Sequence, residues 1–263
     1  MRFASPVAAV VRPLSSAYLD CLRTHDAVID LPLAMAQHRA YCDALAEAGV
    51  QLHWAWPEPG CPDACFVEDT AVVLGAEALL TRPGAPSRRP EVPGVAAALS
   101  HACRLSALSA PATLDGGDVL RVGDTLYVGR SERTNDAGVA GLRTFAEAQG
   151  LQVVVVPLAA GLHLKSVATF LPPHRVVLVV DSVDPACFTS RGVDVVWTAE
   201  PAGGNALALG DRVLVSADAP ELGLRLVDEG LRVVSLDLTE IHKGDGALTC
   251  LSVRLPQPGT WCA

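Results

Sequence analysis

The stretch TLYVGRSERTNDAGVAGLRTFAEAQGLQVVVVP, residues 125–157, contains the pattern that decides the fold. It begins with a short apolar run, 125–128, which ends in a polar turn. A segment of helical periodicity follows at 136–150 and ends at a glycine, as helices prefer. A second apolar run, 151–157, closes the unit. This order of elements predicts two strands joined by a turn and a helix.

The same unit recurs five times along the chain. Its first runs lie at 8–11, 78–81, 125–128, 176–180 and 212–215, and its closing runs at 50–56, 105–108, 151–157, 193–198 and 231–238. Helical periodicity is clearest at 35–49, 92–103, 136–150 and 219–230. Such units cannot bury their apolar faces alone, so they stack around a common axis.

The repeats predict an α/β fold, a five-bladed α/β propeller of ββαβ units with helices outside and a central channel. The alternative is an open α/β sheet. Doublets of strands between successive helices argue against it, because a βαβ sheet alternates strictly. In a closed ring, loops that leave equivalent strands converge, so motifs that are distant in sequence are expected to meet at the channel.

Composition restricts the classes of function. The chain has 263 residues, half of them apolar, and an even spread of glycine and proline, which predicts one domain over 1–263. A net charge of −9 argues against nucleic acid as a partner. We expect no membrane segment, because no apolar run approaches about 20 residues. The N-terminus is unlike a secretory signal, and scattered cysteines suit reduced thiols, so we expect a cytoplasmic protein.

Four loops are rich in functional side chains. The first, 63–70, carries the carboxylates of Asp63, Glu68 and Asp69. Without histidine it is a poor metal site, but carboxylates bind a guanidinium well. The alternative is a solvated acidic turn. Cys61 and Cys65 lack a second ligand pair, so loop packing is favoured over a metal there too.

The second loop, 114–120, sets two glycines between Asp115 and Asp118, and the third, 161–166, places His163 after an apolar run. Such a turn brings a ligand close to the backbone, and its acid can orient a histidine. The alternative for loop 114–120 is an ordinary hairpin turn. The alternative for His163 is a hydrogen-bonded core histidine.

The fourth loop, 129–135, is basic and contains Arg133; together with Arg88 it is suited to a carboxylate. An acidic and a basic end of one channel match an amino acid that bears a guanidine. Near the C-terminus, glycines flank Asp245 in a tight turn, and Cys250 then opens the last apolar run. A thiol there can be a nucleophile, although a cysteine beside such a run is more often packed and inert.

Six motifs, in this order, carry a resemblance to the dimethylarginine dimethylaminohydrolases: FVEDTAVV, LTRPGAPSRR, TLDGGDVL, VGRSERTN, GLHLKS and DGALTC. That family belongs to the guanidino-modifying superfamily of five-bladed α/β propellers. The resemblance covers about residues 10–255. Two departures are noted: Gly244 stands before Asp245 where a larger apolar residue is expected, and residues 18–26 have no clear counterpart.

The resemblance implies that Cys250 is the nucleophile, His163 the general acid and base, and Asp115 the acid that orients it. It also implies that Asp63, Glu68 and Asp69 grip the guanidinium and neighbouring groups, while Arg88 and Arg133 hold the α-carboxylate. Asp245 is included as a substrate-binding residue.

The implied reaction is hydrolysis of Nω-methylated arginines to citrulline and an alkylamine through a covalent thiouronium intermediate. The expected partner is a small guanidino substrate, with no metal and no organic cofactor. The sequence leaves open whether the chain forms a homodimer. Alternatives are an arginine deiminase or amidinotransferase of the same superfamily and a non-catalytic propeller that binds a partner.

Overall fold

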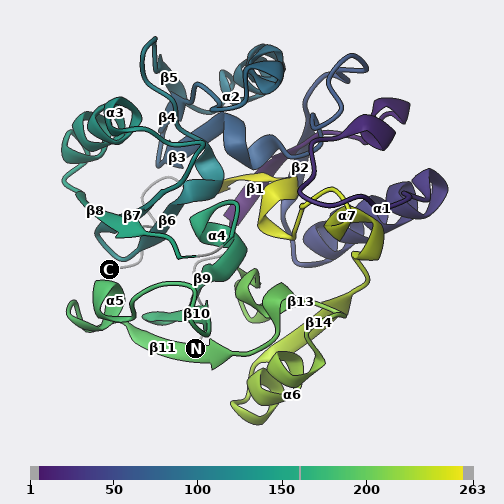
Figure 1. The fold of residues 1–263 in the computed structure, drawn as a ribbon, viewed down its shortest axis with the longest axis vertical. Coiled ribbons are helices and arrows are strands. Elements are labelled where there is room, and N and C mark those ends of the chain that lie inside the picture. Colours follow the sequence, from purple (N-terminus) through teal and green to yellow (C-terminus); the bar gives the residue numbers. More distant parts are fainter. Residues whose placement is uncertain (1–5, 160, 257–263) are drawn as a thin grey trace.

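A computed structural model of the chain describes residues 6–159 and 161–256 and contains five three-stranded sheets. The sheets lie around a common centre, with the longer helices on the outside (Figure 1). The strands are β1 (Pro6–Val11), β2 (Gln51–Trp54) and β15 (Val253–Pro256); β3 (Ala71–Leu74), β4 (Glu77–Leu80) and β5 (Arg104–Ala107); β6 (Val119–Val122), β7 (Thr125–Arg130) and β8 (Gln152–Pro157); β9 (Ala168–Leu171), β10 (Arg175–Val179) and β11 (Asp194–Thr198); and β12 (Leu207–Leu209), β13 (Arg212–Ser216) and β14 (Arg232–Leu236). The predicted five-bladed propeller is confirmed.

Every sheet has the same internal topology. An inner strand pairs antiparallel with the middle strand, and an outer strand pairs parallel with it. A parallel pair needs a crossover, and a helix supplies it in each unit. The apolar runs read from the sequence are the middle and outer strands of the five blades.

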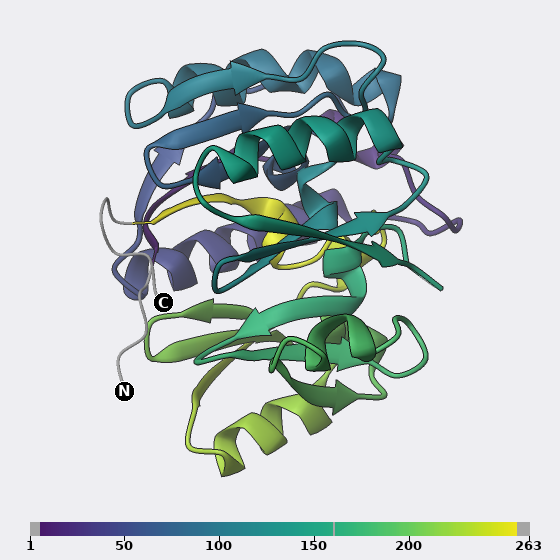
Figure 2. The same ribbon diagram turned by 90° about the vertical axis from the view of Figure 1, so that its left-hand side faces the viewer.

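The first blade is assembled from both ends of the described chain. Its middle strand β1 pairs parallel with β2 and antiparallel with β15, with Val10 opposite Val253. Figure 2 shows this yellow C-terminal strand beside the purple N-terminal one. The last strand therefore closes the ring.

Four crossover helices match the predicted segments: α1 (Leu31–Glu47), α2 (Val92–Leu99), α3 (Asp136–Glu147) and α6 (Pro220–Asp228). Glycines 49, 150 and 230 follow three of them with φ of +85°, +73° and +83°, the left-handed turn that favours glycine after a helix. The fourth blade has only the one-turn helix α5 (Ala186–Thr189), which is too short to show helical periodicity. Among the described residues, no helix is long and apolar enough to cross a membrane.

The middle strands are buried on both faces because each sheet packs between two neighbours. On β7, Leu126 and Val128 join one apolar cluster, while Tyr127 between them joins the next. Period-two alternation thus sends successive side chains into different clusters, which is why the strand is continuously apolar in sequence. Each fully buried side chain of this size contributes roughly 1.5–3 kcal/mol.

A single helical turn precedes the inner strand of each blade. These turns are η2 (Val67–Thr70), η4 (Gly116–Asp118), α4 (Leu164–Val167), η5 (Pro201–Gly204) and η6 (Thr249–Leu251), before β3, β6, β9, β12 and β15 respectively. Several contact one another, including η2 with η4 and η6, and α4 with η4. The propeller therefore gathers five equivalent chain positions at one end of its channel.

Candidate active site

A cavity of about 150 Å³ lies at this gathering of helical turns. It brings together seven of the nine predicted site residues, which are Asp63, Asp69, Arg88, Arg133, His163, Asp245 and Cys250. The other lining residues are Leu22, Arg23, Thr24, Phe66, Leu162, Gly244 and Gly246. Asp115 and Glu68 do not line this cavity.

Asp115 lies behind the histidine instead of in the cavity. It is fully buried directly before η4, and its Oδ2 is 3.0 Å from Nε2 of His163, which directly precedes α4. Its Oδ1 accepts a hydrogen bond from the backbone N–H of Gly84 at 2.8 Å. This carboxylate is therefore fixed at both oxygens. Its role in orienting the imidazole stays a prediction.

The two glycines after Asp115 are required for close packing. A Cβ on Gly116 would lie 2.1 Å from the carbonyl oxygen of Glu68, and one on Gly117 would lie 2.6 Å from Asp69 Oδ1 and 2.8 Å from His163 Nδ1. The sequence suggested that these glycines bring a ligand near the backbone. In the structure they bring the acidic loop and the histidine together.

His163 is held in its charged form. Burial alone lowers its pKa, but the charge of Asp69 and the hydrogen bond to Asp115 outweigh burial and raise the pKa to about 9. The distance from His163 Nδ1 to Asp69 Oδ1 is 3.9 Å. At neutral pH this residue is an imidazolium that can donate a proton into the cavity.

Asp69 is held in its ionised form at the junction of the two clusters. Its Oδ1 accepts from the N–H of Gly117 at 2.9 Å, and its Oδ2 pairs with Nη1 of Arg88 at 2.5 Å. Burial opposes ionisation, but the charges of His163 and Arg88 outweigh it and lower the pKa to about 2. An ionised carboxylate in this position is suited to a guanidinium.

The two arginines predicted to bind a carboxylate differ in environment. Arg88 is buried, pairs with Asp69 and Glu91, and donates to the carbonyl of Phe66 at 2.7 Å. The half-buried Arg133 has no ion pair among residues 6–159 and 161–256. Of these two arginines, Arg133 is therefore the one whose guanidinium is available. The role of Arg88 towards a carboxylate stays a prediction.

The segment between β1 and α1, which the sequence did not assign, covers the cavity. Leu22 N–H donates to Asp63 Oδ1 at 3.0 Å, and Thr24 donates to Asp245 through its N–H at 2.5 Å and its hydroxyl at 2.9 Å. Long-range hydrogen bonds fix the position of this segment, so no local pattern in its sequence could predict that position. The sequence shows only that the segment lacks strand or helix periodicity.

Gly244, where a larger apolar residue was expected, has no room for a side chain. A Cβ there would lie 2.6 Å from the hydroxyl oxygen of Tyr18 and 2.9 Å from Sγ of Cys21. The covering segment thus packs against this glycine. Asp245 itself has φ of +55°, a left-handed conformation that aspartate adopts more readily than most residues other than glycine.

Cys250 lies on η6 and lines the cavity. Burial, followed by the charges of Glu68 and Asp69, raises the pKa of its thiol to about 12. At rest the site therefore holds a neutral thiol and a protonated histidine. A bound cation would favour the thiolate by offsetting the two carboxylates.

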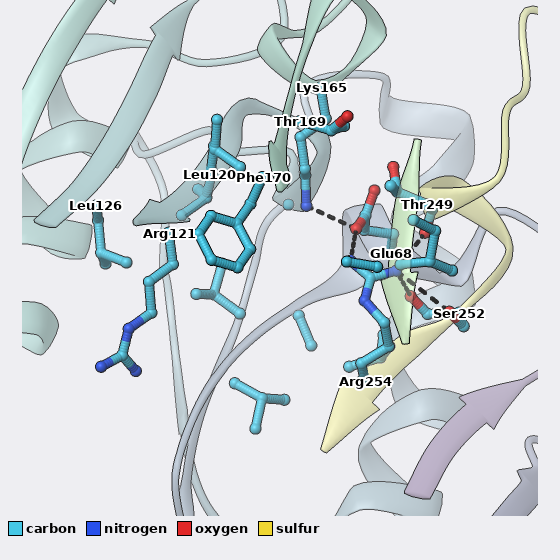
Figure 3. A pocket seen from close by; sticks show the side chains of 18 of the residues that line it. Glu68, Leu120, Arg121, Leu126, Lys165, Thr169, Phe170, Thr249, Ser252 and Arg254 are labelled. Carbon is cyan, nitrogen blue, oxygen red and sulfur yellow. Dashed lines mark hydrogen bonds and ion pairs between the residues drawn. The ribbon is translucent and has the colours of Figure 1, made fainter. Parts of the chain in front are cut away.

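The side chain of Glu68 does not point into the cavity that contains Cys250, although the sequence motif suggested that it would. Its Oε1 pairs with Nζ of Lys165 and with Nη2 of Arg254, each at 2.6 Å (Figure 3). It lines a second cavity together with both cations. Its assignment to substrate binding stays a prediction.

In the described part of the chain, one group of side chains has the residue types and spacing of a metal site. Asp69, Asp115 and His163 offer atoms that all lie within 4.8 Å of one another. A metal bound through His163 Nε2 would have to replace the hydrogen bond between this atom and Asp115. Cys61 and Cys65 are buried free thiols.

Comparisons with known proteins agree with this geometry, although no family model matches the chain. It is 43% identical over 251 residues to N(G),N(G)-dimethylarginine dimethylaminohydrolase of Streptomyces coelicolor, covering 94% of this chain and 96% of that protein. It is 31% identical over 227 residues to the Pseudomonas aeruginosa protein of the same name, covering 86% and 89%.

Solved structures give the same result. The chain matches the Pseudomonas aeruginosa enzyme, as a cysteine-to-serine mutant complexed with citrulline, with a TM-score of 0.89 and 28% identity over 95% of this chain and all of that one. The N-terminal domain of ArgZ, a cyanobacterial arginine dihydrolase, matches with a TM-score of 0.83 at 18% identity, covering 95% of this chain and 98% of that one, and shows a shared fold. By its sequence identity to curated members over nearly its whole length, the chain belongs to the N(G),N(G)-dimethylarginine dimethylaminohydrolase family.

Proposed function

We propose that the protein hydrolyses Nω-methylated arginines, dimethylarginine and monomethylarginine, to citrulline and dimethylamine or methylamine. The observation that carries the proposal is the convergence of Cys250, the His163–Asp115 pair and the ionised Asp69 at one small cavity. The names of the curated relatives support the substrate class.

Substrate binding is the step that activates the thiol. The guanidinium cation is held by Asp69, and its charge offsets the carboxylates that raise the pKa of Cys250. The thiol then loses its proton to solvent, and Sγ attacks the guanidine carbon. This covalent route divides a barrier that delocalisation makes high for direct attack by water.

His163 begins the cycle protonated, which suits the first half of the reaction. As the C–N bond to the alkylated nitrogen breaks, the imidazolium donates its proton to the departing amine. The neutral imidazole, still held by Asp115, then takes a proton from the water that attacks the thiouronium carbon. The S–C bond breaks, citrulline leaves, and Cys250 regains its proton.

The amino-acid end of the substrate is assigned to Arg133, supported by its available guanidinium in the same cavity. Asp63 and Asp245 lie on this cavity and hold the covering segment through Leu22 and Thr24. We propose that the segment closes the chamber over the substrate. The location is proposed as cytoplasmic, supported by the seven free cysteines of the described residues.

Product analysis tests the proposal. Incubation with dimethylarginine should release citrulline and dimethylamine in equal amounts, and Cys250→Ser should abolish both while leaving the circular dichroism spectrum unchanged. A matched control is Cys187→Ser, because Cys187 is also a partly exposed thiol but lies on α5 and does not line the cavity. Release of ammonia from arginine as the faster reaction, or turnover by the Cys250 variant, would reject the assignment.

A further inference from the structure

A second cavity, of about 240 Å³, lies among the inner strands of the propeller and shares no lining residue with the first. Its walls come from β3, β6, β9, β12 and β15, so it occupies the channel (Figure 3). One wall is charged, with Lys165, Glu68 and Arg254. The facing wall is largely apolar and includes Leu120, Leu126 and Phe170.

The charged wall holds two cations against one carboxylate. Both cations contact the same oxygen, Glu68 Oε1, and Glu68 Oε2 has no hydrogen-bond partner although it is buried. Burial alone lowers the pKa of Arg254, but the charge of Glu68 outweighs it and raises the pKa, so this guanidinium stays charged. The cluster therefore carries one net positive charge in a setting of low polarity, which attracts an anion.

Hydrogen-bond donors are also in excess on this wall. Lys165 is more than nine-tenths buried, and an ammonium has three N–H donors, yet among the described residues its Nζ contacts Glu68 Oε1 alone. Arg254 donates from Nη1 to the carbonyl of Thr249 and to Ser252, and from Nη2 to Glu68. Buried donors of this kind are stabilised by an acceptor from outside the chain.

The two walls together define the chemical class of a ligand. A negatively charged head group would pair with Lys165 and Arg254 and bring the cluster to neutrality. A short alkyl tail would lie against Phe170 and Leu126 on the facing wall. Arg121 also lines the cavity, but its Nε donates to the carbonyl of Gly123 at 2.9 Å, and it is not part of the head-group site.

We propose that this inner cavity binds a small monocarboxylate, with its head group between Lys165 and Arg254 and its tail against Phe170. The site is separate from the catalytic cavity but linked to it through Glu68, whose negative charge already acts on Cys250. A second negative charge beside Glu68 disfavours the thiolate further. The bound carboxylate is therefore expected to slow alkylation of Cys250 without competing with substrate.

Butyrate is the probe, used with the substrate-free protein, so that the result does not depend on the reaction proposed above. We expect saturable binding of butyrate in saturation-transfer NMR and no binding of butyramide, which has the same shape without the charge. Arg254→Leu should weaken binding about tenfold or more, because it removes one charge-assisted hydrogen bond. Arg254→Lys should restore most of the affinity.

Two controls separate this site from other arginines. Arg133→Leu tests the catalytic cavity, and Arg104→Leu removes a surface arginine that is also paired with one glutamate, Glu77. Arg104→Leu should bind butyrate like the parent protein. Arg133→Leu should lose at most weak binding in the catalytic cavity and should keep the binding that depends on Arg254. If Arg254→Leu does not fold, Phe170→Trp fills the cavity from the other wall and should also weaken binding.

Several results would overturn the proposal. One is that butyramide binds as well as butyrate. Another is that Arg133→Leu loses butyrate binding while Arg254→Leu or Phe170→Trp keeps it. A third is that butyrate shows no saturable binding. The second readout is the rate of Cys250 alkylation by iodoacetamide. Butyrate should lower this rate in the parent protein and leave it unchanged in Arg254→Leu.

Discussion

The hydrogen bond between Asp115 and His163 gives a prediction in which magnitude and pH dependence are both determined. A histidine pKa of about 9 against an ordinary 6.5 corresponds to roughly 3 kcal/mol of preference for the charged form in the folded protein. A buried hydrogen bond to a charged group supplies roughly 1.5–3 kcal/mol of such a preference. Asp115→Asn should therefore lower the pKa of His163 to between about 7 and 8.

The sign of the stability effect follows from the raised pKa. The charged histidine stabilises the folded state below pH 6.5, its unfolded value, and this contribution is lost as the pH rises through about 9. At pH 6 the variant should lose roughly 1.5–3 kcal/mol of unfolding free energy. By pH 10 the difference should largely disappear, because His163 is neutral in both proteins.

Urea unfolding at pH 6 and pH 10, with NMR titration of the histidine ring, measures both quantities. Asp218→Asn is the matched control, since Asp218 forms a similar 2.9 Å pair with His242 on the surface, where such pairs are worth about 1 kcal/mol or less. The high-pH fall in kcat should also move to lower pH in Asp115→Asn. An equal loss of stability at both pH values would refute the reasoning, because Asp115 would then act only through packing.

Three further predictions concern single contacts. Gly117→Ala should lower kcat strongly, because the added Cβ would lie 2.6 Å from Asp69 Oδ1; steady-state kinetics with a check of the Tm would show it, and an unchanged kcat would contradict it. Arg133→Ala should raise KM for methylarginines far more than for an amine that lacks the carboxylate, and equal effects in the kinetics would exclude the assignment. Tyr18→Phe should cost about 1 kcal/mol and lower the Tm by about 2–4 °C, because its hydroxyl donates to the buried carbonyl of Glu240 at 3.0 Å; calorimetry that finds no change would argue against this bond.

The sequence predicted the repeated part of the fold because its signals are local. Apolar runs and helical periods are set by near neighbours, and glycines after three helices mark their ends. The inner strands were harder to see as members of the repeat, since β12 has only three residues and β15 pairs with the opposite end of the chain.

The predicted site divides in the same way. Cys250, His163 and Asp69 came from motifs that occupy equivalent turns of the repeat, and the structure brings them to one cavity. The direction of the Glu68 carboxylate was not readable, because it depends on Lys165 and Arg254, which lie 97 and 186 positions away. Local patterns place a residue in a turn, and distant partners decide which way its side chain points.

Because β15 closes the ring, the position of Cys250 depends on the last part of the described chain to be synthesised. Cys250 lies on the turn directly before this strand, and β1 lacks its antiparallel neighbour until residues 253–256 have been made. Because a ribosome makes the chain from its N-terminus, blades two to five can form first, whereas the first blade and the thiol are set in place together. A nascent chain therefore has no assembled thiol site, and the sulfur is positioned by the same pairing that completes the fold.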